Sequence, residues 1–405
     1  MAGRHRHRLA GAAAARTADG RARGGRRRRA RRRRDRIRRR QRRGGALIAH
    51  PDYATRLLAW FDVHGRHDLP WQHPRTPYRV WLSEIMLQQT QVRVVIPYFE
   101  RFVAALPDVR ALAAAPQDDV LALWSGLGYY ARARNLHAAA KACVELHDGD
   151  LPRDPGALLA LPGIGRSTAG AILSQAWGDA FPILDGNVKR VLARRHAVEG
   201  WPAQPKIEKQ LWAIAETLLP ATRLADYTQA QMDFGATLCT RHSPACLLCP
   251  VNADCAAFAQ GRVDELPTPR PTKALPEREA SVLLLEDRDG RVLLEKRPPT
   301  GIWASLWSLP QVDDDALAVD WLRTQMPSLV DAADLDMPRR LLPVQHGFTH
   351  FRLRLQPLHW AGLAACHHVR DNDALRWVAR EDLATLGIPA PIRTLLLAPR
   401  IALED

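Results

Sequence analysis

The chain has 405 residues, enough for two domains with cores of their own. Its 58 Lys and Arg exceed its 43 Asp and Glu, which gives a formal net charge of +15. Residues 1–45 hold 20 of the basic side chains, all Arg, and only 2 of the acidic ones, so residues 46–405 carry a formal charge of −3. Any nucleic-acid-binding surface on the folded part must therefore be a local basic patch.

The Arg-rich segment 1–45 has almost no apolar residues with which to build a core, which predicts a disordered tail. It could hold phosphates without sequence preference, or it could be the translation of GC-rich DNA upstream of the true start; the sequence leaves both open. The first serine is Ser83, which argues against a Ser-rich transit peptide. No apolar run reaches the ~18 residues of a membrane span, so we expect a soluble, cytoplasmic protein with no membrane partner.

From about residue 50 to 235 the apolar residues recur with helical spacing. One face is formed by Val80, Trp81, Ile85 and Leu87, and the face of a following helix by Val92, Val95, Ile96 and Phe99. Short breaks containing Gly or Pro separate the helices at 106–107, 126–128, 161–163 and 184–186.

Two turns in this region carry chemistry. The stretch 161–170 is a tight Gly-x-Gly turn, with Gly163 and Gly165, that opens into a helix. Free N–H groups at such a helix start can face an anion, although many such turns are purely structural. In the second turn Asp185 precedes a basic helix containing Asn187 and Lys189, where it could also be an ordinary N-cap.

Four cysteines lie within seventeen residues, with the spacing C-x6-C-x2-C-x5-C. They are Cys239, Cys246, Cys249 and Cys255. Disulfide scaffolds belong to small secreted chains, so a metal centre is the better interpretation. The spacing by itself favours a [4Fe–4S] cluster only modestly over zinc.

After this segment the pattern changes. Residues 262–279 contain four prolines and are predicted to be a linker. The stretches 281–285 and 291–294 flank an Asp289-Gly290 turn and predict a β-hairpin, and 351–355 alternates like a half-buried strand. Residues 280–405 are therefore predicted to be a separate α+β domain, and residues 46–261 the helical one.

The stretches 80–92 and 126–136, taken with the Gly-x-Gly turn, Asp185 and the four cysteines, resemble the A/G-specific adenine DNA glycosylases of the MutY type, in the helix-hairpin-helix glycosylase superfamily. The resemblance runs from about Tyr53 into the C-terminal domain. It implies a mostly α helix-hairpin-helix glycosylase domain with a [4Fe–4S] cluster loop over 239–255, plus a C-terminal α+β Nudix-like domain. The four cysteines would be the cluster ligands.

Cleavage of an N-glycosidic bond requires an acid for the departing base and a negative charge near the cationic sugar. Glu84 lies among Trp81, Ile85 and Leu87, where an apolar setting could keep it protonated, although it could equally lie on an exposed helix face. The resemblance implies that Glu84 protonates the flipped adenine and helps to activate water, while Asp185 stabilises the oxocarbenium-like sugar.

The target base must leave the DNA stack to reach these groups. The resemblance implies that Gln89, Leu127 and Tyr129 insert near the opposing base, with Thr90 nearby. Tyr129 has a ring suited to stacking, whereas Tyr130 beside it could equally be the core aromatic. Three further residues match positions that line the adenine pocket, namely Trp71, Leu87 and Gln229. The other expected DNA contacts are Gly163, Gly165, Ser167, Asn187 and Lys189.

Ser167 separates two kinds of enzyme. Bifunctional relatives of the endonuclease III type carry a lysine nucleophile at this place, so Ser167 favours a monofunctional glycosylase that leaves an abasic site. Lys189 could give adventitious Schiff-base trapping or contact a phosphate.

The Nudix-like domain lacks the Arg-Glu-x-x-Glu-Glu run that nucleotide hydrolysis requires, so we expect no hydrolase activity there. The segment 346–351 resembles the family's loop for 8-oxoguanine. The recognising residues would be Phe348, Thr349, where serine is more usual, and His350. Alternatively the segment is an ordinary turn leading into a strand.

The predicted function is therefore excision of adenine opposite 8-oxoguanine or guanine by a monomer on double-stranded DNA, at the nucleoid. Two alternatives remain. A bifunctional glycosylase–lyase for oxidised pyrimidines would need a lysine in place of Ser167. A non-catalytic iron–sulfur or zinc DNA-binding protein would not need both Glu84 and Asp185.

Overall fold

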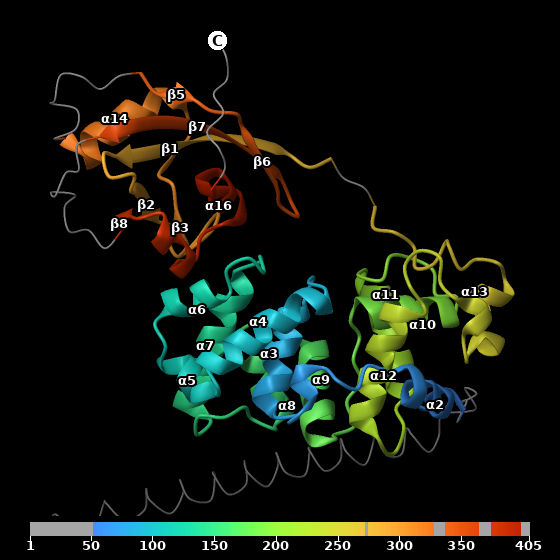
Figure 1. Ribbon diagram of the computed structural model, residues 1–405. Coiled ribbons are helices and arrows are strands. Elements are labelled where there is room, and N and C mark those ends of the chain that lie inside the picture. The colour runs from blue at the N-terminus through green and yellow to red at the C-terminus, as the bar shows by residue number, and fades with distance from the viewer. Residues whose placement is uncertain (1–51, 272–273, 328–336, 364–373, 398–405) are drawn as a thin grey trace, which may run out of the picture. The chain divides into compact units, whose positions relative to one another are not determined.

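The computed structural model describes residues 52–271, 274–327, 337–363 and 374–397 (Figure 1). The predicted disordered tail, 1–45, lies outside the described residues. Within the described ranges, no helix combines the length and apolar character needed to cross a membrane.

The predicted helical region is confirmed, and its helices form two groups with separate cores. The first group comprises α3 (Pro77–Leu87), α4 (Val92–Ala105), α5 (Val109–Ala114), α6 (Gln117–Leu123), α7 (Ala131–Leu146), α8 (Pro155–Ala160) and α9 (Arg166–Trp177), with the short helix η1 (Pro70–Gln72). The second comprises α2 (Asp52–His64), α10 (Gly186–Arg195), α11 (Pro205–Thr217) and α12 (Leu224–Thr237), followed by the cysteine segment with η2 (Cys246–Leu248), η3 (Asn252–Asp254) and α13 (Ala256–Ala259).

Helix α3 carries the first candidate site residue, and its sequence explains its position. Thr76 caps the helix by accepting a hydrogen bond from the backbone N–H of Arg79, and Pro77 occupies the first helical position. Trp81, Leu82 and Met86 are fully buried in the first core, so the helix is anchored along its length. It ends at Leu87, where the chain turns through residues 88–90.

Two glycines allow the Asp185 turn to lie between helices. A Cβ on Gly170 of α9 would lie 2.4 Å from the carbonyl oxygen of Pro182, and a Cβ on Gly235 of α12 would lie 2.6 Å from the Cβ of Asn187. Real Cβ atoms do not approach so closely, so both positions require glycine. The close packing fixes Asp185 between the two helical groups.

The C-terminal region contains a mixed sheet, with strand order β3-β2-β1-β7-β5 along its main path. The strands are β1 (Glu277–Asp287), β2 (Val292–Lys296), β3 (Trp307–Ser308), β4 (Gln311–Val312), β5 (Arg339–Arg340), β6 (Val344–Gly347), β7 (Arg352–Leu363) and β8 (Leu375–Val378). The predicted hairpin is confirmed by the antiparallel pairing of β1 with β2. The longest pairing, between β1 and β7, is parallel and joins segments distant in sequence.

Both faces of this sheet are covered. Val282 and Leu284 of β1 pack with α16 (Ala390–Leu397) on one face, while Leu283 and Leu285 pack with α14 (Ala318–Gln325) on the other. Two short helices, η4 (Asp315–Leu317) and η5 (Glu381–Thr385), complete the domain. Strand β1 starts at Glu277, three residues inside the predicted linker, and the domain boundaries at 261 and 280 stay predictions.

Candidate active site

A cavity of about 510 Å³ lies between the two helical groups. Its wall contains seven of the residues that the sequence singled out, contributed by η1, α3, the turn after α3, the Asp185 turn, α10 and α12. They are Trp71, Glu84, Leu87, Thr90, Asp185, Asn187 and Gln229. The structure therefore brings both candidate catalytic carboxyl groups and all three candidate pocket residues to one cavity.

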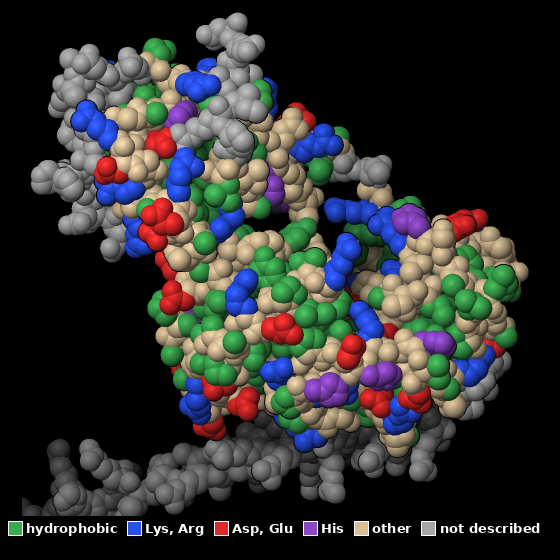
Figure 2. All heavy atoms as spheres, in the orientation of Figure 1, with side chains coloured by type: hydrophobic (Ala, Val, Ile, Leu, Met, Phe, Trp, Pro, Cys, Tyr) green, Lys and Arg blue, Asp and Glu red, His purple; other side chains and the backbone are tan. Residues whose placement is uncertain are grey.

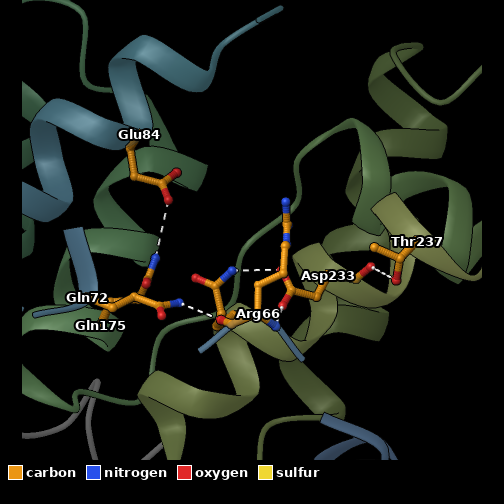
Figure 3. A network of polar contacts seen from close by, with 7 residues as sticks. Arg66, Gln72, Glu84, Gln175, Asp233 and Thr237 are labelled. Atoms are coloured by element: carbon orange, nitrogen blue, oxygen red, sulfur yellow. Dashed lines mark hydrogen bonds and ion pairs between the residues drawn. The ribbon is translucent and has the colours of Figure 1, made fainter. Parts of the chain in front are cut away.

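Glu84 projects from α3 toward the cavity, as Figure 3 shows, so it is not on an exposed helix face. Burial raises the pKa of its carboxyl to about 8, and the nearby charge of Asp185 acts in the same direction. The side-chain amide of Gln175 on α9 donates to Glu84 Oε1 at 3.2 Å and partly offsets these effects. Glu84 is thus held as a neutral acid near pH 7, able to give a proton to a base in the cavity.

Asp185 both caps a helix and lines the cavity. It is the N-cap of α10, because Oδ1 accepts a hydrogen bond from the backbone N–H of Val188 at 2.7 Å. It also lines the cavity. Burial raises the pKa of its carboxyl, while the N–H groups of Val188 and Asn187 and the charges of Arg190 and Lys189 act to lower it. These donors and cations favour the ionised form.

A second polar network, centred on Asp233, includes Arg66 and Gln229 of the cavity wall (Figure 3). Asp233 of α12 is fully buried, and its carboxylate accepts hydrogen bonds from the backbone N–H of Arg66 at 2.7 Å and from Arg66 Nε at 2.9 Å. Gln229 Nε2 donates to the same carboxylate at 2.8 Å. This leaves Gln229 Oε1 buried without a protein partner. An acceptor of this kind can receive a hydrogen bond from an amino group placed in the cavity.

Two exposed turns lie beside α3 and α7, and each places a predicted DNA contact in a strained conformation. Gln89 has φ +60° and Tyr129 has φ +50°, which is the left-handed region disfavoured for side chains with a Cβ. Both side chains are exposed, Tyr129 by 51%. Tyr130, by contrast, is partly buried, so Tyr129 is the aromatic available for stacking.

Leu127 does not match its predicted role in this conformation. Its side chain is only 6% exposed and packs in the core of the first helical group. The adjacent glycines, Gly126 and Gly128, have positive φ and turn the chain so that Tyr129 points outward while Leu127 points inward. Insertion of the Leu127 side chain near the opposing base would therefore require a rearrangement of this loop, and that contact stays a prediction.

The Gly-x-Gly turn joins α8 to α9, with Gly163 and Gly165 both exposed. Gly163 has φ +78°, which the turn requires. Behind the turn, Ser167 Oγ accepts a hydrogen bond from the backbone N–H of Leu184 at 3.0 Å, so this side chain braces the Asp185 turn. Lys189 forms an ion pair with Glu208 of α11 at 2.7 Å.

Basic side chains border the hollow between the two helical groups in the space-filling view (Figure 2). Arg66, Arg190 and Arg241 belong to the cavity wall itself. This arrangement agrees with the local basic patch expected of a folded part whose formal charge is −3.

The four clustered cysteines follow α12, and two of them, Cys239 and Cys249, pack against the core of α2 and α12. None of them forms a disulfide. Burial raises the pKa of the Cys246, Cys249 and Cys255 thiols. Within the described residues, no group of three or more His, Cys, Asp or Glu is arranged to hold a single metal ion. A set of four neighbouring thiols has the donor chemistry of an iron–sulfur centre.

In the C-terminal domain, Thr349 and His350 are exposed at the tip of the hairpin between β6 and β7. The backbone N–H of Phe348 donates to the carbonyl oxygen of Phe351 at 2.9 Å and closes this tip. The ring of Phe348 stacks on Phe351, with centroids 4.5 Å apart, and meets the edge of His346. The segment is thus a turn leading into a strand. It also exposes the polar side chains of Thr349 and His350 beside the packed rings of Phe348 and Phe351.

Several residues of the site were not predicted from the sequence. Arg66 and Asp233 lie 167 residues apart, and neither belongs to a motif that would pair them. Gln175 lies in the last turn of α9 and contacts Glu84 only through the packing of α3 on α9. The regular helical spacing around it gave no indication of that role.

The chain is similar to known DNA repair proteins. Residues 82–217 match the model of the HhH-GPD superfamily of base excision DNA repair proteins, and residues 281–398 match the NUDIX domain. The adenine DNA glycosylase of Buchnera aphidicola subsp. Acyrthosiphon pisum is 35% identical over 85% of this chain and 96% of its own length. The human adenine DNA glycosylase is 33% identical over 83% and 72%, and that of Schizosaccharomyces pombe 30% identical over 85% and 86%, respectively.

The chain combines a helix-hairpin-helix domain with a C-terminal NUDIX domain, and its similarity extends over nearly the full length of the Buchnera protein. It therefore belongs to the adenine DNA glycosylase family.

Proposed function

We propose that this protein is a monofunctional glycosylase that hydrolyses the bond between adenine and deoxyribose where adenine is mispaired with 8-oxoguanine or guanine in duplex DNA. The observation that carries the proposal is the pairing of two carboxyl groups in one cavity, with Glu84 held neutral and with N–H donors and cations around Asp185 that oppose the rise of its pKa on burial. This is the division of labour that glycoside cleavage requires.

In the proposed reaction, the flipped adenine enters the cavity and accepts a proton from Glu84, which makes it a neutral leaving group. The bond from its nitrogen to the sugar carbon breaks, and the electron pair goes to the base. Asp185 stabilises the positive charge that develops on the sugar. Water then adds to the sugar carbon and returns a proton to Glu84, which leaves an abasic site and free adenine. Gln229 Oε1 is positioned to accept a hydrogen bond from the amino group of adenine.

The absence of an amine nucleophile in the hairpin supports the monofunctional assignment. Ser167 is engaged with the backbone of Leu184, and Lys189 is paired with Glu208. The test is a strand-nicking assay on duplexes carrying adenine opposite 8-oxoguanine. We expect nicks only after treatment with alkali. Nicks without alkali would establish a lyase step and contradict the proposal.

We propose that Cys239, Cys246, Cys249 and Cys255 hold a [4Fe–4S] cluster, which would fix the shape of this segment beside α10 and α12. Cys249→Ser should lose iron and the broad visible absorption of the cluster, whereas the wild-type chain should contain about four iron atoms. Cys143→Ala is the matched control, because Cys143 is buried in the first helical group and should not affect iron content. Zinc in place of iron in the wild-type protein would contradict the assignment.

We propose that Phe348, Thr349 and His350 recognise 8-oxoguanine opposite the adenine. Thr349 and His350 are exposed and can donate or accept hydrogen bonds. Thr349→Ala should lower the preference for adenine opposite 8-oxoguanine over adenine opposite guanine by roughly 5–10-fold, the value of about one hydrogen bond. Thr349→Ser should keep it. Equal excision ratios for wild type and Thr349→Ala would remove Thr349 from this role.

The DNA contacts are proposed to come from Gln89 and Tyr129 at the flipped site and from Gly163, Gly165 and Asn187 at the hairpin and cavity. The protein would act on its duplex as a monomer and, because its substrate is DNA, at the nucleoid. Leu127 is left out of this set because it is buried.

A further inference from the structure

Arg132, near the start of α7, is buried and lies between the turn after α3 and the loop before α7. Its Nη1 atom donates to the carbonyl oxygens of Ile85, Met86 and Gln88 at 3.0, 2.8 and 2.5 Å. Its Nη2 atom donates to Thr90 Oγ1 and to the carbonyl oxygens of Leu127 and Gly128 at 3.3, 3.2 and 3.1 Å. One guanidinium thus joins six acceptors from two separate segments.

The acceptors on α3 are chemically significant. Ile85 and Met86 belong to the last turn of the helix that carries Glu84, where backbone carbonyls have no partner within the helix. A buried cation at this end also opposes the partial negative charge of the helix dipole. Arg132 therefore fixes the end of α3, and with it the position from which the chain turns into residues 88–90.

Both segments carry an exposed residue in a strained backbone conformation, Gln89 on one and Tyr129 on the other. Such conformations persist only where the surroundings hold them. Arg132 contacts the residues on either side of Gln89 and the residue just before Tyr129, and its guanidinium carbon lies 5.5 Å from the centroid of the Tyr129 ring. Among the described residues, Arg132 is the one that donates hydrogen bonds to both turns.

We infer that Arg132 is a positioning residue that sets the spacing of Gln89 and Tyr129, so that the two side chains act together to hold the target adenine out of the duplex. This inference rests on the proposed function, because it assumes that both turns enter the DNA. Arg132 itself does not line the cavity and takes no part in the bond cleavage.

The test uses Arg132→Lys, which keeps the charge but has a single, flexible ammonium group that cannot reach six acceptors on two segments. Three quantities are measured on the full-length protein: the single-turnover rate of adenine excision, the fluorescence rise of 2-aminopurine placed at the target position, and the affinity for an undamaged duplex. We expect the excision rate and the fluorescence rise to fall together, by about 10–100-fold for the rate, since small misplacements of positioning groups have effects of this size. Affinity for the undamaged duplex should change less than about twofold, because phosphate contacts dominate it.

The matched control is Arg79→Lys. Arg79 lies on α3, the helix whose end Arg132 contacts, and among the described residues its guanidinium donates to one carbonyl, that of Pro70. It should retain both excision and the fluorescence rise. All rates are compared at the same interval below each variant's melting temperature, so that a general loss of stability does not imitate the effect. If Arg132→Lys gives the same fluorescence rise and rate as Arg79→Lys, the inference is wrong. A wild-type protein that flips 2-aminopurine but excises no adenine would instead refute the proposed function and leave Arg132 testable.

Discussion

Replacing Glu84 with Gln is expected to lower adenine excision by at least about 100-fold, and up to ~10⁴-fold, while DNA binding is retained. The amide has the size of the carboxyl group and can still accept the hydrogen bond from Gln175, but it has no proton to give to the base. Single-turnover excision and equilibrium binding to an 8-oxoguanine:A duplex measure the two properties separately. Glu145→Gln, on the exposed face of α7, is the control and should behave like wild type.

The pH dependence of wild-type activity gives an independent check on the same group. Because the pKa of Glu84 is about 8, the carboxyl is protonated below that pH and loses its proton above it. The excision rate should therefore fall as the pH rises through about 8. Full activity at a pH well above this value, or measurable turnover by Glu84→Gln at wild-type rate, would remove Glu84 from the role of acid.

Glu84→Gln should change stability in the opposite sense to activity. Folding raises the pKa of Glu84 from 4.5 to about 8, so the folded protein binds this proton more tightly than the unfolded chain. The contribution of Glu84 to the free energy of unfolding therefore falls as the pH rises from about 4.5 to about 8. Glu84→Gln removes that loss, so the variant should be more stable than wild type near pH 8, on the order of 4 kcal/mol, with little difference near pH 4.

The sequence predicted the parts of this site that lie within continuous motifs. Glu84 and Leu87 share a helix whose apolar spacing was clear, and Asp185 lies in a Gly-containing break just before a helix, so their local structures could be anticipated. The cavity itself could not, because it depends on Gly170 and Gly235 allowing α9 and α12 to approach the Asp185 turn. A Gly inside a helix indicates a close contact without identifying the partner.

Hydrogen-bond partners that are distant in sequence could not be predicted either, because local sequence does not identify the contacting residue. The spacing around Arg132 is that of any basic residue on a helix, yet the folded chain places six acceptors around it. Leu127 shows the converse. A motif match indicated a DNA contact, whereas the positive φ of Gly126 and Gly128 directs this side chain into the core and Tyr129 outward. In the C-terminal domain the β1–β2 hairpin was predicted from local sequence, but the parallel pairing of β1 with β7 was not.

Replacing Asp185 with Asn is expected to separate its two roles. The Asn side-chain oxygen can still accept the hydrogen bond from the backbone N–H of Val188, and Asn is as good an N-cap as Asp, so α10 should keep its start. The negative charge, however, is lost. If this charge stabilises the cationic sugar, excision should fall by about 100-fold or more, the size typical of removing a preorganised electrostatic group.

The melting temperature of Asp185→Asn should stay close to that of wild type or rise. Burial raises the pKa of Asp185, which means that the folded protein bears a cost for keeping this group ionised. Asp108→Asn is the matched control, because Asp108 caps α5 by the same kind of hydrogen bond, to the backbone N–H of Ala111, away from the cavity. A protein in which both Asn variants excise adenine at the wild-type rate would show that Asp185 is only a helix cap. If instead Asp185→Asn loses excision while Asp108→Asn keeps it, at equal stability, the negative charge of Asp185 is required for excision. The helix cap alone would then not explain why Asp185 lies in the cavity.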